Sequence, residues 1–177
     1  LHWWGVYDYE QGLTSTPVTA PWTAAANDVD SFYETGVAYQ NSVNIVSTSE
    51  KSSLRIGYTN VNMTGTVPNA SQNKNTFNIN GTTKLWDGFA EVNANVTYVN
   101  TYTKGRPQFG YGDNSQSQKF FQWGQRQVDM NRLSTYMNPD GTQRTWNRNS
   151  YDDPAPHYSD NPYWTAYKNY QDDDRNR

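Results

Sequence analysis

The sequence contains no cysteine and only two histidines, His2 and His157, which lie near opposite ends of its 177 residues. The absence of cysteine excludes disulfide frameworks, thiol catalysis and cysteine-ligated zinc. The two histidines are too far apart in sequence to form the i, i+4 pair of a helical zinc site. Carboxylates are present, but the sequence sets no pair of them apart as glycoside hydrolysis would require. We therefore expect no metal, no cofactor and no enzymatic activity.

Aliphatic residues and charges are also scarce. Leu, Ile, Val and Phe make up about 15% of the chain, below the roughly 20% at which disorder becomes a serious alternative. Disordered chains, however, are strongly charged and poor in aromatics, whereas here the net charge is -3 and aromatics supply 15%. The scattered Lys and Arg form no basic stripe, so nucleic acid is not expected as a partner. No apolar run approaches the roughly 18 residues of a membrane-spanning helix.

The chain is instead rich in Asn, Thr, Ser, Tyr and Trp, and its central part has a period of two. Alternating apolar and polar residues predict strands over residues 37–46, 53–60, 75–85 and 90–102. The polar turn Thr48–Lys51 joins the first pair of strands. The second pair is joined by Trp86-Asp87-Gly88-Phe89, which carries the Asp-Gly signal of a hairpin. The predicted fold class is all-β, with antiparallel hairpins.

Each predicted strand has one apolar and one polar face, because successive side chains point to opposite sides of a sheet. The residues expected on the apolar face are Val37, Tyr39, Val43, Ile45, Leu54, Ile56, Tyr58, Phe77, Ile79, Val92, Val96 and Tyr98. The residues expected on the polar face are Gln40, Ser42, Asn44, Arg55, Asn78, Asn80, Lys84, Glu91, Asn93 and Asn95. In a membrane, the first set would face lipid and the second the interior of a barrel.

The connections between the predicted strands alternate between short turns and long segments, the latter at residues 61–73 and 103–160. Outer-membrane barrels place their short turns in the periplasm and their long loops outside, and strands of about ten residues can cross a bilayer at a tilt. A soluble sandwich has no reason to separate turns in this way. The pattern favours part of a large antiparallel transmembrane β-barrel, with about five strands and long extracellular loops.

In this interpretation, successive segments of the chain lie outside the cell, in the membrane or in the periplasm. Residues 1–36 form an extracellular loop with a short helix over Asn27–Glu34, and residues 37–102 form two transmembrane hairpins. Residues 103–160 form a long extracellular loop with a candidate amphipathic helix from Ser115 to Met137. Residues 161–177 hold a fifth strand over Tyr163–Tyr170, followed by a closing periplasmic turn.

An ordered series of segments carries a family resemblance. The series is TGVAYQNSVNIV, SSLRIGYTN, NKNTFNINGTTKL, ANVTYVNT, KGRP, FFQWGQRQVDMNRL, NPYW and DDDRNR. In this order and with this hairpin spacing, it resembles the middle of the barrel of SusC/RagA-like TonB-dependent transporters of the Bacteroidetes outer membrane. The resemblance covers most of residues 27–177.

The resemblance implies a barrel of the plugged, 22-stranded type. It implies outer-membrane location and uptake of oligomeric nutrients, either glycan or peptide. The implied partners are a SusD-like surface lipoprotein, a TonB complex contacted through regions outside these residues, the lipid, and the remainder of the barrel with its plug. Because five strands cannot close such a barrel, we expect these residues to be a segment of a longer polypeptide or to be completed by other chains.

Aromatic residues of the predicted loops are candidates for contact with the cargo or with the lipoprotein lid. They are Trp3, Trp4, Trp22, Tyr111, Trp123 and Trp146. Such rings stack on sugars or pack on peptides while amides supply hydrogen bonds. For Trp123 and Trp146, packing between loops is an equal alternative. The rival interpretation of the whole chain is a secreted, non-catalytic carbohydrate-binding β-sandwich, in which the apolar faces meet in a core.

Overall fold

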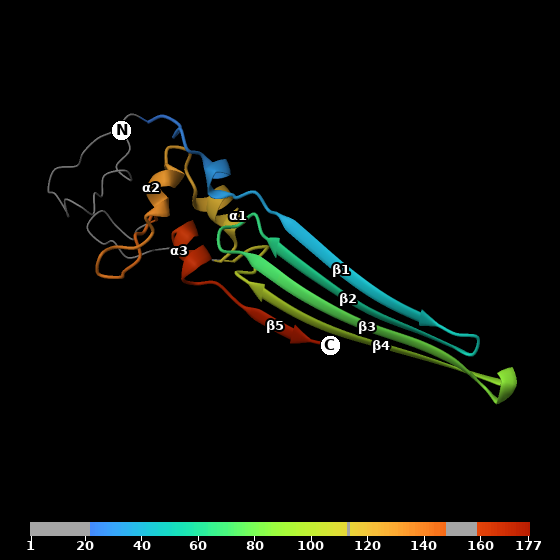
Figure 1. Ribbon diagram of the computed structural model, residues 1–177. Helices are drawn as coiled ribbons and strands as arrows, with labels where there is room; N and C mark the ends of the chain where they lie inside the picture. Colours follow the sequence, from blue (N-terminus) through green and yellow to red (C-terminus); the bar gives the residue numbers. More distant parts are fainter. Residues whose placement is uncertain (1–21, 113, 148–158) are drawn as a thin grey trace. The chain divides into compact units, whose positions relative to one another are not determined.

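The computed structural model describes residues 22–112, 114–147 and 159–177 (Figure 1). These residues form two compact units. The sheet unit consists of Thr35–Gly65, Ala70–Arg106 and Gln171–Arg177, and the loop unit consists of the described parts of Leu1–Glu34, Thr66–Asn69 and Pro107–Tyr170. Each unit is described separately.

The sheet unit is one open antiparallel sheet with five strands in the order β1-β2-β3-β4-β5 (Figure 1). The strands are β1 (Ala38–Thr48), β2 (Ser52–Thr64), β3 (Ser71–Leu85), β4 (Ala90–Lys104) and β5 (Asp173–Asn176). Each strand pairs with its neighbour in sequence. The all-β prediction and the four long strands that it placed between residues 37 and 102 are confirmed.

Strands β2 and β3 are longer than the alternation of apolar residues predicts. The segment 61–73, expected as a loop, is mostly strand, because β2 continues to Thr64 and β3 starts at Ser71. Its asparagines pair across the ladder, with Asn62 opposite Asn73. The Asn73 side-chain amide donates to Asn62 Oδ1. A pattern search based on apolar residues misses this extension, because side-chain amides rather than apolar groups line it.

Both short turns join strands at the same end of the sheet. In the first, the Ser49 backbone N–H donates to the Ser52 carbonyl at 2.7 Å. The second passes through Trp86 and Asp87, both with positive φ (48° and 54°), into Gly88 (φ 96°). Lys51 Nζ lies 2.7 Å from Asp87 Oδ1 and so links the two turns. Because both side chains are largely exposed, this ion pair contributes little to stability.

The loop unit contains short helical segments around an aromatic core. They are the 3-10 turn η2 (Val29–Phe32), the helix α1 (Gln116–Gln118), the π-helical turn η4 (Lys119–Trp123), α2 (Met130–Ser134) and α3 (Pro162–Tyr167). Phe32 is 1% exposed and lies at its centre. Its ring centroid is 4.9 Å from that of Tyr163 and 5.1 Å from that of Phe120. Such edge-on aromatic pairs add to the stabilisation that burial gives.

The short helix expected in the first loop is present, with a different cap. Asp28 precedes η2 and accepts a hydrogen bond from the Val29 N–H. Asn27, which the sequence places at the start of this helix as a candidate N-cap, instead donates to the Asp129 carboxylate at 3.0 and 3.2 Å. The Ala25 N–H also donates to the Arg126 carbonyl at 2.8 Å. Several hydrogen bonds therefore join residues 25–28 to residues 126–129.

The single helix predicted from Ser115 to Met137 is wrong. The structure has α1 and η4, then an extended stretch, then α2. The break occurs at Gly124, whose backbone is extended and whose Cα approaches Phe120 so closely that a Cβ would lie 2.7 Å from the Phe120 carbonyl oxygen. Asp129 then caps α2 by accepting from the N–H groups of Asn131 and Arg132. Phe120, Met130 and Leu133 thus face the core from separate short segments, whereas Phe121 is exposed.

The prediction of a strand over Tyr163–Tyr170 with a closing turn is also wrong. Residues Pro162–Tyr167 are the helix α3, and the strand lies over Asp173–Asn176, where the turn was expected. Pro162 at the first helical position suits a helix start. Asn161 caps that start with Oδ1, which accepts from the Tyr163 N–H at 2.9 Å. Fully buried, Asn161 also donates to the carbonyls of Leu133 and Arg144 at 3.1 and 2.9 Å.

Candidate functional site

The register of the sheet gathers most of the apolar residues of β1 to β4 on one face, termed here the apolar face. One cross-strand row consists of Ile45, Ile56, Ile79 and Val96. The next consists of Val43, Tyr58, Phe77 and Tyr98. Ile45 is 64% exposed and Val96 59% exposed. Every residue predicted for this face shares it, because the strands alternate and pair in the expected register.

Aromatic residues lie at both ends of the stretch of strands that carries the apolar rows. At the turn end, Trp86 and Phe89 are 75% and 88% exposed, and their ring centroids are 6.5 Å apart. At the other end, the Phe77 ring lies 4.6 Å from that of Tyr58 and 6.4 Å from that of Tyr98. From Phe77 to Leu85 the strand spans about 26 Å at its usual rise. We call the region between these rings the apolar band.

Beyond the aromatic row, the same face becomes polar. The next row consists of Asn41, Asn60, Asn75, Asn100 and Asn176, termed the asparagine row. The hydroxyl of Tyr58 donates to Asn75 Oδ1 at 2.7 Å, and that of Tyr98 donates to Asn176 Oδ1 at 2.8 Å. These tyrosines therefore join an apolar ring surface to a polar row, as amphipathic aromatics do at a boundary between apolar and wet surroundings.

Two residues predicted with the apolar set lie outside the band. Tyr39 pairs with Asn62 and belongs to the row beyond the asparagine row. Val37 lies one row further, where its carbonyl accepts from the Thr64 N–H at 2.9 Å. Both residues lie on the face of the sheet that the alternation predicts, but polar rows separate them from the apolar band.

The opposite face of the sheet is mostly polar and carries the whole predicted polar set, together with Val46, Val61, Met63 and Val99. Its side chains bond across the strands. Ser42 and Thr59 hydroxyls are 3.0 Å apart, and Thr97 Oγ1 donates to Asn78 Oδ1 at 2.9 Å. Arg55 Nη2 donates to Asn44 Oδ1 at 3.2 Å. A face of amides, hydroxyls and charges suits contact with water or with polar ligands.

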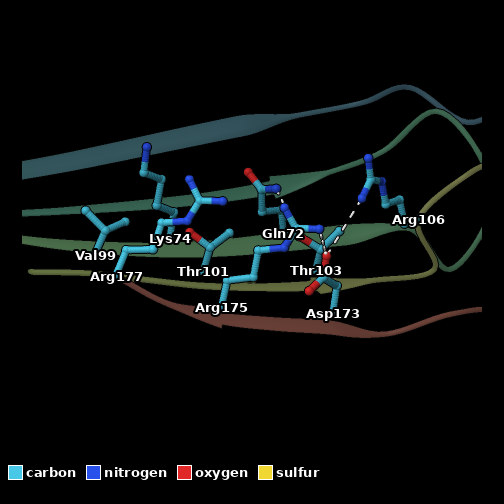
Figure 2. A pocket seen from close by; sticks show the side chains of 9 residues that line it. All are labelled: Gln72, Lys74, Val99, Thr101, Thr103, Arg106, Asp173, Arg175 and Arg177. Carbon is cyan, nitrogen blue, oxygen red and sulfur yellow. Dashed lines mark hydrogen bonds and ion pairs between the residues drawn. The ribbon is translucent and has the colours of Figure 1, made fainter.

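A hollow of about 520 Å³ lies on this polar face, at the end of the sheet away from the short turns (Figure 2). It is lined by Gln72, Lys74, Val99, Thr101, Thr103, Arg106, Asp173, Arg175 and Arg177. Asp173 Oδ2 lies 2.5 Å from Arg175 Nη2 and 3.7 Å from Arg106 Nη1. The hollow is therefore rich in cations, with one carboxylate already held between guanidinium groups.

The aromatic residues proposed for cargo or lid contact do not form one cluster in the described residues. Trp3 and Trp4 lie outside those residues. Trp22 and Tyr111 are exposed, and Trp123 is half-buried. Trp146 is half-buried, its ring centroid lies 6.2 Å from that of Phe120, and its Nε1 donates to the Ser159 carbonyl at 3.2 Å. For Trp146 the contacts are those of loop packing.

Two features of the site were not predicted from the sequence. Phe109 and Phe121 are 84% and 92% exposed in the loop unit. Like Tyr111, both are aromatic residues of a predicted loop, so the same signal could have identified them as contact candidates. The cationic hollow was also missed. Lys74 lies just before the predicted strand 75–85, and Arg175 lies in a strand where a turn was expected.

The pKa of Asp28 makes one contact of the loop unit sensitive to pH. The Val29 N–H and the guanidinium of Arg126, 2.7 Å from Asp28 Oδ2, hold the pKa of this carboxyl below its ordinary value. A group with a lowered folded pKa stabilises the fold above its unfolded pKa of about 3.9 and loses that effect as the pH falls through the folded pKa.

We expect hydrogen exchange of residues 25–31 to accelerate below about pH 4, relative to the Asp28→Asn variant measured at the same pH. The variant cannot titrate at this position, so the ratio of the two exchange rates should change with pH. A ratio that stays constant from pH 7 to pH 3 would contradict the role assigned to the Asp28 carboxylate.

Searches of protein-family profiles, curated proteins and solved structures found no match to this chain. Among the described residues, no helix is long and apolar enough to cross a membrane. In the same part of the chain, no three His, Asp or Glu side chains gather into a group that could hold a metal ion.

Proposed function

We propose that these residues form part of the wall of an outer-membrane TonB-dependent transporter of the SusC/RagA-like type. The observation that carries the proposal is the apolar band, which crosses four paired strands, is exposed, and has aromatic residues at both ends of its strand stretch, in the turn at one end and in a cross-strand row at the other. Transmembrane barrels have an outward apolar band about 25 Å tall between two aromatic girdles. At a tilt of about 40°, the 26 Å of strand gives a height of about 20 Å, to which the bounding rings add.

The other face of the sheet supports the same proposal. Strands of such barrels alternate apolar outward and polar inward. Here the inward face would carry the amides, hydroxyls and charges, and the hollow would open from the lumen wall. Monomeric soluble proteins rarely expose contiguous apolar patches of this extent.

The proposal assigns different surroundings to different rows. The ten predicted lipid-facing residues of the band would contact hydrocarbon. The asparagine row, with Tyr39 and Val37 beyond it, would lie in the headgroup region or outside. Because backbone groups in hydrocarbon must be paired, the proposal requires further strands beside β1 and beside the part of β4 that β5 does not cover.

In the proposed mechanism, the loop unit stands on the extracellular side, where a SusD-like lipoprotein would deliver a glycan or peptide oligomer. The cargo would pass along the polar face after a TonB complex, acting through the plug, opens the lumen. The sheet itself would act as a rigid wall, and its polar side chains would supply the hydrogen bonds that replace those of water.

The first test is the size and location of the natural polypeptide. We expect a denatured mass several times 20.3 kDa, found in the outer-membrane fraction after alkaline washing. Disrupting its gene should abolish uptake of an oligomeric nutrient while uptake of the corresponding monomer continues. A soluble species of 20.3 kDa would overturn the proposal and favour the carbohydrate-binding sandwich instead.

A further inference from the structure

The hollow on the polar face collects side chains from three strands and one connection. Gln72 and Lys74 come from β3, Thr101 and Thr103 from β4, and Arg175 from β5. The register puts them in two adjacent rows. One holds Gln72, Thr103 and Asp173, and the other holds Lys74, Thr101 and Arg175. The residues therefore meet because of strand pairing and not because of closeness in sequence.

The lining is unbalanced in charge. It contains the cations Lys74, Arg106, Arg175 and Arg177 and the single carboxylate of Asp173. Asp173 pairs with Arg175 and Arg106. Within the described residues, neither Lys74 nor Arg177 forms an ion pair. The protein as a whole has a net charge of -3, so this concentration of positive charge does not follow from its composition.

The cations are spaced so that they can act on one group. Lys74 and Arg175 both pair with Thr101, from opposite sides, which puts their Cα atoms about 10 Å apart at the usual strand spacing. Their long side chains can converge above Thr101. The Arg177 backbone pairs with Val99, one row further along, through hydrogen bonds of 2.9 Å.

The contacts of Asp173 indicate which anion suits the hollow. A carboxylate between two guanidinium groups forms charge-assisted hydrogen bonds, for which the planar fork of arginine is well shaped. Asp173 lies between two such groups, hydrogen-bonded to the Arg175 guanidinium at 2.5 Å and in a longer ion pair with that of Arg106 at 3.7 Å. Lys74 and Arg177 offer positive charge for a second carboxylate beside it. The volume of about 520 Å³ lies in the range of small-ligand sites.

We propose that this hollow binds a carboxylate group of an acidic oligomer, and that the protein therefore selects polycarboxylate cargo. The inference rests on the proposed function, since it identifies the cargo class of the same transporter. The acidic groups could belong to an oligouronate or to an acidic peptide. The chemistry that the cations recognise is the same in both.

The test is binding to the full-length protein in detergent, measured by titration calorimetry. The probes are hexagalacturonate with neutral maltohexaose as its match, and hexaglutamate with hexaglutamine as its match. At low salt we expect at least one acidic probe to bind tenfold or more tightly than its neutral match, and the difference to shrink as salt rises. The two pairs of probes distinguish sugar from peptide.

The variants distinguish binding at the hollow from a general effect of the protein's positive charges. Lys74→Gln combined with Arg177→Gln should weaken acidic-probe binding tenfold or more, while Lys74→Arg with native Arg177 should retain it. Lys84→Gln, on the same face near the short turns, should leave it within twofold. The inference is overturned if acidic and neutral probes bind alike, or if Lys84→Gln weakens binding as much as the double variant does.

Two further outcomes keep this inference apart from the proposed function. If the protein is in the outer membrane and imports a neutral oligomer without discrimination, the carboxylate site is wrong and the transporter proposal stands. If the polypeptide is soluble, the transporter proposal fails, and with it the assignment of cargo. If the double variant lowers thermal stability without changing probe binding, the cations serve an acidic segment of the protein itself and the inference fails.

Discussion

Replacing Ala94 by arginine in the full-length protein is expected to cost about 2–4 kcal/mol of folding free energy in a bilayer. Ala94 lies in the middle of the apolar band, in the row with Leu54 and Gly81. Its side chain is exposed, so arginine adds a charge without removing a packed group. The cost would arise because the charge is held in hydrocarbon, where it cannot be hydrated. Urea titration of the protein refolded into vesicles measures this free energy.

The adjacent residue provides a matched control. Asn95 is also exposed and lies in the same strand, but its side chain points to the polar face. Asn95→Arg should change the folding free energy by less than about 0.5 kcal/mol, because surface substitutions into water are usually nearly neutral. If Ala94→Arg is as well tolerated as Asn95→Arg, the apolar band does not contact lipid.

The second large effect is expected in the loop unit. Phe32→Ala should destabilise this unit by about 3–5 kcal/mol, the usual range for truncating a buried phenylalanine. Phe32 is 1% exposed and its ring contacts those of Tyr163 and Phe120, which come from distant parts of the chain. Removing the ring would leave a cavity between η2, η4 and α3. Hydrogen exchange of these three segments in the full-length protein reports the change.

Phe121→Ala is the control for this prediction. Phe121 follows Phe120 directly but is 92% exposed, so its removal should change exchange in the same segments little. Equal effects of the two variants would mean that the aromatic core does not hold the loop unit together. Loss of cargo or lid binding in Phe121→Ala with unchanged exchange would instead identify Phe121 as a contact residue.

The sheet could be predicted because one signal determines it. Alternation with a period of two fixes both the strands and their faces, and a slip of one residue would move every side chain to the wrong face. The prediction stopped short where amides replaced apolar residues, at Asn62 and Asn73. There the ladder continues with hydrogen-bonded side chains that an apolar pattern does not reveal.

The loop unit could be predicted only in part, because its elements are short and its core forms between distant segments. A helix of six residues such as α3 is too short to show the helical period of 3.6 residues in its apolar pattern. A cap signal was present, since Asn161 followed by Pro162 is typical of a helix start. The aromatic residues that follow obscure this signal, because aromatic residues are also common in strands.

The strand β5 depended on a partner more than on its own sequence. Asp and Asn are poor strand formers. They are strand residues here because β4 offers an edge and suitable side chains. Asn100 donates to Asp174 Oδ1 at 3.2 Å, and Tyr102 donates to Asp172 Oδ2 at 3.0 Å. The cationic hollow was missed for the same reason, since it forms only when β5 is paired.

The most direct test of the account is the surroundings of two neighbouring side chains, Val96 and Asn95. These 177 residues contain no cysteine, so a nitroxide label can be attached at either position in turn through an introduced cysteine. In membranes, oxygen concentrates in hydrocarbon and a charged nickel chelate stays in water. We predict that the label at 96 collides mainly with oxygen and that the label at 95 shows a clearly lower ratio of oxygen to nickel collisions. Equal ratios at the two positions, or a higher ratio at 95, would contradict the assignment of the apolar face to lipid.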